Sequence, residues 1–416
     1  MTIIASPPPS IAPRRAPIYG LFTATGISLV GSQLTVIAIP WFVLTTTGSP
    51  AKTGLTAFAE ALAAILAAFF GGTFVDRLGH KRASVVADLA SGAIVALVPL
   101  LYATAGLTFW QLLPLVFLRS FFDTPGNTAR AALRPDATTM ANMPPERVNG
   151  GMQAIQRGAG LVGAPLAGVL IALLGTSQVL WLDAGSFAIS AAIVGVLLPG
   201  SVARAKETGP YLAAIADGLR YIRQDRLLLA IATTVGVTNF LGDPLFAVVM
   251  PVYVRERFGS PLALGAMAGA FGGGAMLGAV VFGIIGRRLP RRATFIGAFN
   301  VAPLSLWILA LLPPLPIILI TLIARGIVGG PLNPIIDTVK QERVPIALRG
   351  RVYGTITAIA FAAIPLGMAL AGYLVEWIGV RATLFVMAIA YLATSLSMLI
   401  NPALRGMDIP VQEKAT

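Results

Sequence analysis

Residues 72–82 read Gly-Thr-Phe-Val-Asp-Arg-Leu-Gly-His-Lys-Arg and join two apolar stretches, 52–75 and 83–105. A helix needs about 20 predominantly apolar residues to cross a lipid bilayer, and each of these stretches is long enough. Short loops on the cytoplasmic side of a membrane collect lysine and arginine. The segment 72–82 is therefore predicted to be a cytoplasmic loop between two membrane-spanning helices.

The same hydropathy pattern continues along the chain. Of the 416 residues, 56% are hydrophobic and 11% are charged, whereas soluble domains carry about 25% charged residues. This composition argues against a soluble domain and predicts an all-α membrane protein with twelve transmembrane helices. The predicted spans are 18–46, 52–75, 83–105, 109–131, 152–174, 178–198, 227–254, 261–286, 293–312, 315–338, 352–376 and 381–400.

Positive charge falls unequally on the two sides of these spans. The chain has 30 Lys and Arg against 17 Asp and Glu, a net charge of +13. Of the basic residues, 24 lie on the side of the N-terminal tail, including four around the loop between spans four and five, and four lie opposite. Because cytoplasmic loops are rich in Lys and Arg, both termini are predicted to be cytoplasmic, in a multi-pass protein of the cell membrane. The surplus charge sets the orientation and does not indicate a nucleic-acid partner.

The predicted order is a tail, a six-helix half, a central cytoplasmic loop, a second six-helix half and a second tail. Their ranges are 1–17, 18–198, 199–226, 227–400 and 401–416. Prolines at 7–9 occupy the place of a signal peptide's apolar core, so a signal peptide is not predicted. In the central loop, one face of residues 211–222 carries Leu212, Ile215, Leu219 and Ile222, which predicts an amphipathic helix at the membrane surface.

The two halves repeat short patterns in the same order. Gly31, Pro40 and 48–50 (Gly-Ser-Pro) recur 211 residues later. Arg119, Pro125 and Asn127 recur 206 residues later, and the patterns at 147–150 and 166–168 recur 204 residues later. Two six-helix repeats of parallel orientation are typical of secondary transporters whose site lies between the halves.

At residues 72–82 the chain resembles the major facilitator superfamily, whose loop between spans two and three carries a G-x-x-x-D-R/K-x-G-R/K-x-R/K signature. The matching residues are Gly72, Asp76, Arg77, Gly79, Lys81 and Arg82. The resemblance implies the superfamily fold, and it implies that this loop is a gating latch and not a substrate site. The alternative to a gating latch is that Asp76 and Arg77 simply form a solvated turn. The corresponding segment of the second half, 283–290, has arginine in place of the aspartate.

Span five resembles the motif that marks drug/proton antiporters within the superfamily. Gly151, Gly160, Pro165 and Gly168 match it, while Ala164 and Val169 depart from it. The resemblance favours export, and the alternative is a generic helix interface of small residues. The G-x-G-x-x-G at 158–163 lies in an apolar span with no strand before it, so it is interpreted as packing and not as a nucleotide site.

Composition limits the chemistry further. The chain has no cysteine and one histidine, His80, which excludes disulfides, thiolate chemistry and histidine-cluster metal sites. It also lacks a G-x-x-x-x-G-K-S/T phosphate-binding loop. We therefore expect no cofactor, no metal and no nucleotide partner, with a proton gradient as the energy source.

Charged residues inside spans are costly and indicate functional sites. Arg119 and Asp123 lie four apart on one helical face, so each can offset the other's charge. Arg119 also fits the span-four arginine that the resemblance associates with proton coupling, and the alternative is a structural ion pair. Glu60 and Asp243 are further proton-carrier candidates in the outer half of the membrane. The alternative for both is a side chain that reaches the outer interface.

The candidate cavity residues are polar or aromatic residues within the spans. Asp88 and Asp183 are expected near span ends and are weaker candidates for function. For the polar cavity candidates, helix–helix hydrogen bonding is the alternative, and for the aromatic ones it is lipid contact or core packing. The candidates are Asn127, Arg325, Asn333, Asp337, Trp41 and Phe240.

Residues 39–44 (Ile-Pro-Trp-Phe-Val-Leu) and the following Gly-Ser-Pro resemble the branch of macrolide, multidrug and siderophore exporters, and 402–405 is similar to mycobacterial multidrug efflux members. The hypothesis is a monomeric, proton-coupled exporter of amphipathic drugs or metabolites that works by alternating access and is not an enzyme. The alternatives are a siderophore or other metabolite exporter or importer, an ion channel and, more distantly, a membrane-embedded lipid-modifying enzyme. The last would need interfacial carboxylate or metal-ligand clusters, which the sequence does not indicate.

Overall fold

A computed structural model describes residues 14–200 and 211–408, and every regular element in these ranges is a helix. In a bilayer each backbone N–H and C=O must be satisfied within its own segment, which favours helices. The elements are α1 (Ala16–Thr47), α2 (Pro50–Leu78), α3 (His80–Thr104), α4 (Phe109–Ala141), α5 (Pro145–Leu174), α6 (Thr176–Leu197), α7 (Tyr211–Gln224), α8 (Arg226–Pro244), η1 (Leu245–Val249), α9 (Met250–Arg257), α10 (Pro261–Ile285), η2 (Gly286–Arg288), α11 (Arg291–Ala310), α12 (Leu315–Gly329), α13 (Leu332–Arg343), η3 (Ile346–Leu348), α14 (Arg349–Ala362), α15 (Ile364–Ile400) and η4 (Pro402–Met407).

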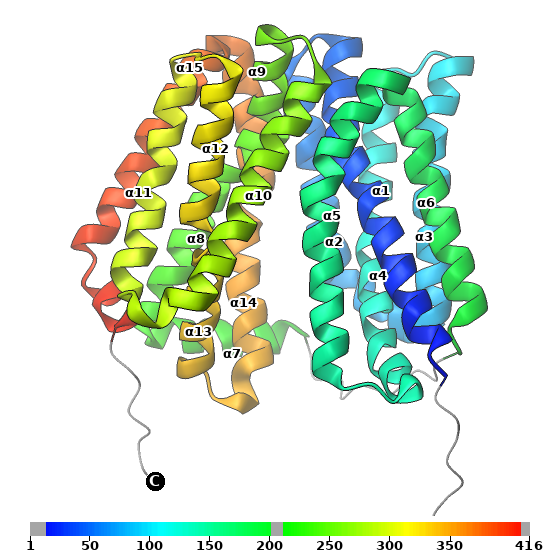
Figure 1. Ribbon diagram of the computed structural model, residues 1–416, viewed down its shortest axis with the longest axis horizontal. Helices are drawn as coiled ribbons and strands as arrows, with labels where there is room; N and C mark the ends of the chain where they lie inside the picture. Colours follow the sequence, from blue (N-terminus) through cyan, green and yellow to red (C-terminus); the bar gives the residue numbers. More distant parts are fainter. Residues whose placement is uncertain (1–13, 201–210, 409–416) are drawn as a thin grey trace, which may run out of the picture.

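The helices form two bundles that stand side by side, α1–α6 and α8–α15 (Figure 1). We call them the first and the second bundle. The described chain begins and ends at the same end of the molecule, and α7 lies across that end (Figure 1). We call this the terminal end and the opposite one the far end.

Within residues 14–200 and 211–408, ten helical stretches are long and apolar enough to cross a membrane. The outer surface fits such a setting because it carries many exposed aliphatic and aromatic side chains, such as Val196, Trp377 and Ile400. The stretch 346–400 counts as one although Gly379, at φ +78°, breaks it. Helix α4 is not among the ten, and its 33 residues include five charged ones.

The structure differs from the predicted spans where proline acts on the helices. Helix α4 runs on to Ala141, and α5 starts at Pro145, so the predicted loop 132–151 is mostly helical. Pro244 lacks an N–H, and the turn that follows it widens to the π-helix η1. Span ten is divided into α12 and α13 before Pro331.

The sequence repeat produces the same turn twice at the far end. Gly48 and Gly259 both adopt the left-handed conformation (φ +71° and +63°), which ends one helix. A proline, Pro50 or Pro261, then occupies the first turn of the next helix, where its missing N–H costs nothing. The 211-residue offset is therefore a structural repeat as well as a sequence repeat.

The bundles contact each other closely at the far end through two glycine pairs. A Cβ on Gly54 would lie 2.8 Å from the Cα of Gly372, and a Cβ on Gly168 would lie 3.0 Å from the Cα of Gly265. Glycine alone permits such close backbone approach. The repeat offsets relate Gly54 to Gly265 and Gly168 to Gly372, so the two crossings, α2 with α15 and α5 with α10, are equivalent by pseudo-symmetry.

A polar contact reinforces one of these crossings. The carboxylate of Glu376 in α15 accepts hydrogen bonds from Ser49 Oγ (2.5 Å) and from the backbone N–H of Ala51 (2.8 Å) at the start of α2. A helix N-terminus favours such a negative charge. The position 204 residues earlier is Ala172, so the α5–α10 crossing has no equivalent carboxylate.

This contact gives a first prediction. Glu376→Gln weakens a charge-assisted hydrogen bond and should make the far end open more readily. We expect a membrane-impermeant thiol reagent, added at that side, to label Asn333→Cys in the cavity about fivefold faster. The chain has no cysteine, so the signal comes from this position alone. Glu256→Gln, an exposed change at the same end, is the control. Equal labelling rates in Glu376→Gln and in the parent would contradict the prediction.

At the terminal end, α7 is held by the second bundle. Tyr221 donates a hydrogen bond to the carbonyl of Arg343 (2.7 Å), and Arg343 pairs with Asp225 (3.1 Å). Ile222 is fully buried, as the amphipathic pattern predicts, whereas the side chains of Leu212 and Ile215 lie outside the described residues. Helix α7 is thus a connecting helix that belongs structurally to the second bundle.

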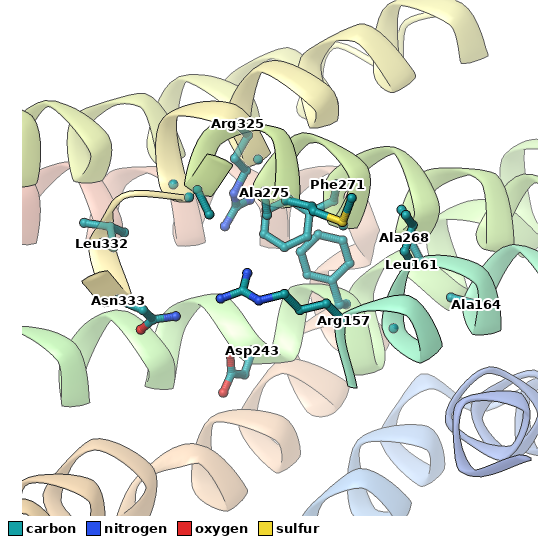
Figure 2. A pocket seen from close by; sticks show the side chains of 18 of the residues that line it. Arg157, Leu161, Ala164, Asp243, Ala268, Phe271, Ala275, Arg325, Leu332 and Asn333 are labelled. Atoms are coloured by element: carbon teal, nitrogen blue, oxygen red, sulfur yellow. The ribbon is translucent and has the colours of Figure 1, made fainter. Parts of the chain in front are cut away.

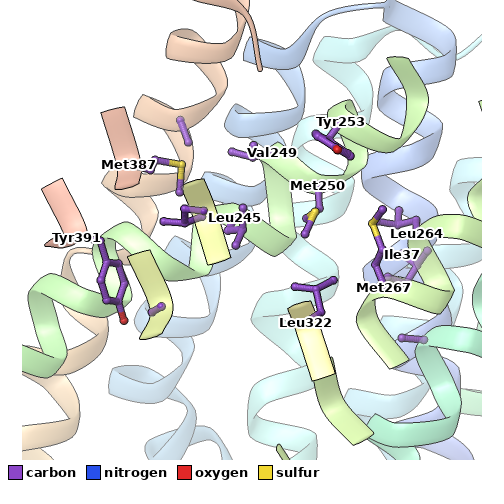
Figure 3. Close-up of a cluster of buried hydrophobic side chains, with 14 of the residues drawn as sticks. Ile37, Leu245, Val249, Met250, Tyr253, Leu264, Met267, Leu322, Met387 and Tyr391 are labelled. Atoms are coloured by element: carbon purple, nitrogen blue, oxygen red, sulfur yellow. The ribbon is translucent and has the colours of Figure 1, made fainter. Parts of the chain in front are cut away.

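The apolar core is continuous around the wide turn η1 (Figure 3). Leu245, Val249 and Met250 of η1 and α9 are buried among side chains of α10, α12 and α15, and Ile37 of α1 approaches from the first bundle. This core lies next to the cavity described below, and it fixes the helix from which Asp243 projects.

Candidate functional site

A buried charge cluster lies inside the first bundle, and Arg119 of α4 is at its centre. Its guanidinium nitrogens lie 3.7 Å from a carboxylate oxygen of Glu60 in α2 and 3.7 Å from one of Asp183 in α6. Arg119 and Asp183 are both buried. One arginine therefore ties together three helices that are distant in sequence.

Asp183 is held by hydroxyl groups as well. Thr35 of α1 donates a hydrogen bond to one carboxylate oxygen, and Ser186 donates to the other at 3.1 Å. Gly31 leaves the space for this contact, because a Cβ there would lie 2.6 Å from Asp183 Oδ1. The repeated glycine of the sequence thus lets α1 and α6 approach each other at a charged group.

A second buried pair lies nearer the terminal end. Arg130 of α4 pairs with Asp88 of α3, and it donates to Asn127 Oδ1 (2.6 Å) and to Ser28 Oγ (3.2 Å). Asn127 in turn donates to Asp123 Oδ1 (3.1 Å). Asp123 therefore joins this second group through Asn127, and no direct ion pair between Asp123 and Arg119 is found in the described residues.

The two groups together hold more carboxylates than guanidiniums. We call them the polar network of the first bundle; it comprises the acids Glu60, Asp88, Asp123 and Asp183, the arginines Arg119 and Arg130, and Asn127. With every group ionised, it would carry two negative charges. A net buried charge is expensive in a bilayer, so the network is suited to bind protons.

A cavity of about 700 Å³ lies between the bundles. The first bundle contributes Arg157 and Leu161 of α5, and the second contributes Asp243 of α8, Phe271 of α10 and Asn333 of α13, among others (Figure 2). This volume is within the range of about 300–1,000 Å³ that is usual for small-molecule sites. Its wall is largely apolar, with charges at a few points.

Arg325 of α12 is the charged group of this cavity with the most defined surroundings. Its guanidinium carbon lies 5.9 Å from the ring centre of Phe246 and 5.8 Å from that of Phe271. It donates a hydrogen bond to Ser305 Oγ (3.3 Å). In the described chain Arg325 has no ion pair with a carboxylate, so the pseudo-equivalent of Arg119 lies in a very different environment.

Some predicted site residues lie in the polar network, some line the cavity, and some lie in neither. Arg119, Glu60, Asp123 and Asn127 lie in the polar network, and Asp243, Arg325 and Asn333 line the cavity. Trp41 is buried in the apolar core, and Phe240 lies where α8 crosses α15, beside Gly367. Asp337 is exposed and pairs with Lys340 (2.6 Å). These last three, like Asn127, are not among the residues that line the cavity.

The 72–82 motif lies at the terminal end, whereas the α5 motif extends from Gly151, near that end, to Gly168, near the far end. In the 72–82 segment, Gly79 (φ +77°) makes the turn between α2 and α3, and Asp76, Arg77 and Arg82 are exposed at the terminal end, next to Gly72 and Lys81. In α5, Gly160 lines the cavity, and Pro165 and Gly168 contact α10 of the other bundle, while Gly151 packs on Phe22. The α5 motif therefore forms part of the interface between the bundles.

Sequence reasoning missed four charged residues. Asp88 and Asp183 are expected near span ends and rank as weaker candidates; in the structure they lie eight and seven residues from the first residue of α3 and α6, and both are buried. Arg130 and Arg157 belong to the four basic residues assigned to the loop between spans four and five, yet one is buried in α4 and the other lines the cavity. The spacing of Asp183, Ser186 and Ser190 on one face of α6 is a signal that could have revealed this buried polar face.

No group of three or more His, Cys, Asp or Glu in the described ranges is placed to hold a metal ion. The charged side chains of both regions instead pair with one another, contact aromatic rings or face the cavity. The arrangement can bind a small molecule between two bundles and can hold protons within one of them.

Comparisons with known proteins agree with this architecture. The chain is 34% identical over 404 residues to the multidrug efflux pump Tap of Mycobacterium tuberculosis (strain ATCC 25618 / H37Rv), with 96% of each chain covered. It is 24% identical over 377 residues to macrolide efflux protein A of Streptococcus pyogenes, covering 87% of this chain and 90% of that protein.

Solved transporter structures share the fold. The nucleoside transporter NupG superposes with a TM-score of 0.73 at 14% identity, covering 92% of this chain and 98% of that one. A bacterial homologue of the iron transporter ferroportin in an inward-facing state gives 0.68 at 14% identity, covering 92% and 98%.

The family comparison covers nearly the whole chain, since the sequence model described as transmembrane secretion effector matches residues 9–414. Together with the ten apolar helices, it establishes a multi-pass protein of the cell membrane and confirms the resemblance that the motifs indicated. The chain belongs to the transmembrane secretion effector family of the major facilitator superfamily.

Proposed function

We propose that this protein exports amphipathic small molecules, drugs among them, by alternating access and in exchange for protons. The observation that carries the proposal is the cavity of about 700 Å³ between two bundles that are joined by glycine crossings at the far end. The drug-exporting names of relatives that match along most of the chain support export over import.

The proposed topology has twelve spans with both termini in the cytoplasm. It counts α4 as a span whose charges face the bundle interior, and it divides 346–400 at Gly379 into two spans. The halves are then 18–198 and 227–400, between the tails 1–17 and 401–416, with 199–226 as the connecting loop. The terminal end faces the cytoplasm, so the described conformation opens inward and the exposed Asp76 loop is an unlatched gate.

Proton coupling is assigned to the polar network. Glu60 and Asp183 share the charge of Arg119 at equal distances of 3.7 Å. If one carboxylate takes up a proton, Arg119 keeps only the other, and the forces between α2, α4 and α6 change. Asp123, held by Asn127, is a further carrier in the same network. Because α2 also forms a crossing between the bundles, a shift of α2 would transmit the change to the far end.

The alternative functions differ in whether they use this cavity. A siderophore or other metabolite exporter would use the cavity with different cargo, and it differs from the main proposal only in the substrate. A lipid-modifying enzyme would need a catalytic cluster at the membrane interface. The described charged groups at the terminal end, such as Arg291 with Glu342 and Arg351 with Asp217, pair with one another, and no described group of three or more His, Cys, Asp or Glu is placed to hold a metal ion. We propose that the protein acts as a monomer, since both bundles and the cavity belong to one chain.

Export and its energy source can be tested together. Cells that produce the protein should accumulate less of several amphipathic drugs than cells without it, and an uncoupler should abolish the difference. In proteoliposomes, adding drug should drive proton counterflow that a trapped pH dye reports. Glu60→Gln, Asp123→Asn and Asp183→Asn then assign the carrier, because neutralising it should remove the counterflow.

Accumulation that is equal with and without the protein would refute export. Export that persists fully with uncoupler would refute proton coupling alone. Arg220→Gln, at an exposed position of α7 whose side chain is 74% accessible, is the control for the variant series.

A further inference from the structure

The charges that face the central cavity are unequal in number. Arg157 comes from α5 and Arg325 from α12, while Asp243 of α8 is the acidic group among the cavity's lining residues. Neither arginine makes an ion pair with a carboxylate in residues 14–200 and 211–408. The cavity therefore presents two guanidiniums and one carboxylate to whatever occupies it.

The guanidinium of Arg325 is held in place by two aromatic rings and one hydroxyl group. Phe246 and Phe271, whose ring centres are 4.7 Å apart, cover one side of its guanidinium. A guanidinium has five N–H donors, and the contact to Ser305 uses one of them. Arg325 lines the cavity and has no described carboxylate in an ion pair with it, so an anion that enters the cavity can supply the missing partner.

Arg157 lies across the space from Arg325 with its guanidinium directed into the cavity, and Asp243 lies on the other side of Arg157 in the view of Figure 2. One carboxylate cannot neutralise two guanidiniums. A second negative charge supplied between Arg157 and Arg325 would balance the site.

We propose that the cavity selects amphipathic molecules that carry an acidic group together with a flat apolar part. The acidic group binds between Arg157 and Arg325, and the apolar part lies against the wall formed by Leu161, Ala268 and the two phenylalanines. The inference rests on the proposed function in that it takes this cavity as the substrate site.

The position of the two arginines also gives the ligand a mechanical effect. Arg157 belongs to the first bundle and Arg325 to the second. An anion held by both draws the bundles together around the ligand, and a ligand without the anion lacks this contact. Acidic cargo would thereby promote the closure that alternating access requires.

The test compares two dyes that differ at one group. Rhodamine 110 has a free carboxylate, and rhodamine 123 is its methyl ester with the same ring system. Fluorescence polarisation with the purified full-length protein in detergent should give a dissociation constant at least about tenfold lower for the acid, the effect of one charge-assisted contact. Arg157→Gln and Arg325→Gln should each remove most of this preference.

Two variants control for misfolding. Asp243→Asn removes the competing carboxylate and should strengthen binding of the acid, a change opposite in sign to those of the arginine variants. Arg325→Lys keeps the charge but loses the planar stack, so it should retain part of the preference. The ester serves as an internal reference for folding: it carries only the positive charge of the ring system, so its affinity should not fall when Arg157 or Arg325 is replaced by glutamine.

Equal binding of the two dyes, a preference for the ester, or no binding of either would overturn the inference. The measurement uses no gradient, so it is independent of export and of proton coupling. Drug export with no acid preference would overturn the inference alone, whereas acid preference without export would overturn the proposed function alone.

Discussion

Arg119→Gln is expected to abolish drug-driven proton counterflow and to destabilise the protein. The change leaves Glu60 and Asp183 without the cation that lies 3.7 Å from each. Removing one partner from a buried ion pair costs about 3–5 kcal/mol, because the remaining charge stays buried and unpaired. Without this guanidinium, proton uptake by Glu60 or Asp183 could no longer redistribute a shared charge among α2, α4 and α6, so coupling should be lost. Counterflow in proteoliposomes and thermal unfolding followed by tryptophan fluorescence measure the two effects.

A double variant separates the two consequences. In Arg119→Gln with Asp183→Asn, one buried charge fewer remains, so we expect much of the lost stability to return while counterflow stays absent. Arg119→Lys keeps a positive charge and should be intermediate. Counterflow at the parental rate in Arg119→Gln would remove Arg119 from the coupling mechanism.

Gly168→Trp is expected to stop transport by holding the far end open. A Cβ at this position would already lie 2.7 Å from the carbonyl oxygen of Pro261 and 3.0 Å from the Cα of Gly265. Both neighbouring groups are backbone atoms and cannot move aside as a flexible side chain can. An indole is far larger than a methyl group, so α5 and α10 cannot close on each other and the state described here becomes inaccessible.

The measurement combines drug efflux with labelling of Asn333→Cys in the cysteine-free chain. Efflux should fall to the level of cells without the protein, and labelling from the far side should become fast. Gly297→Trp is the matched control, because a Cβ there meets no atom within 4 Å. Efflux in Gly168→Trp at the level of the Gly297→Trp control would show that this crossing need not close.

The sequence predicted the features that depend on local pattern or on repetition. The charged turn at 72–82, the amphipathic segment that forms α7 and the repeated Gly-Ser-Pro turns all appear in the structure. Each depends on neighbouring residues, so periodicity and turn chemistry were sufficient to find it.

The contacts between helices that are distant in sequence could not be predicted from local sequence patterns. The pairing of Arg119 with Asp123 was inferred from their four-residue spacing, whereas the structure pairs Arg119 with Glu60 and Asp183 on other helices. Spacing along one helix shows which side chains share a face, but not which helix that face meets. Arg157 falls inside predicted span five, 152–174, but near its start, and is therefore counted with the charges around the loop; the structure places it twelve residues inside α5, which begins at Pro145.

The repeat preserves backbone geometry but not chemistry. Arg119 and Arg325 occupy equivalent positions 206 residues apart. The first lies between two carboxylates, and the second lies over two aromatic rings. Duplicated helices thus carry different tasks, with proton exchange proposed for one bundle and recognition of cargo for the other.

The carboxylate of Glu376 strengthens one of the two crossings at the far end, which has a consequence for the order of events during opening. Glu376 holds the α2–α15 crossing at the start of α2, whereas the pseudo-symmetric α5–α10 crossing has Ala172 at the equivalent position and lacks this carboxylate. Two helix crossings of unequal strength are not expected to separate at the same time. We expect the weaker α5–α10 crossing to separate first, while the α2–α15 crossing acts as the hinge. The bundles would then rotate apart about α2 and α15, and the cargo would leave on the α5–α10 side.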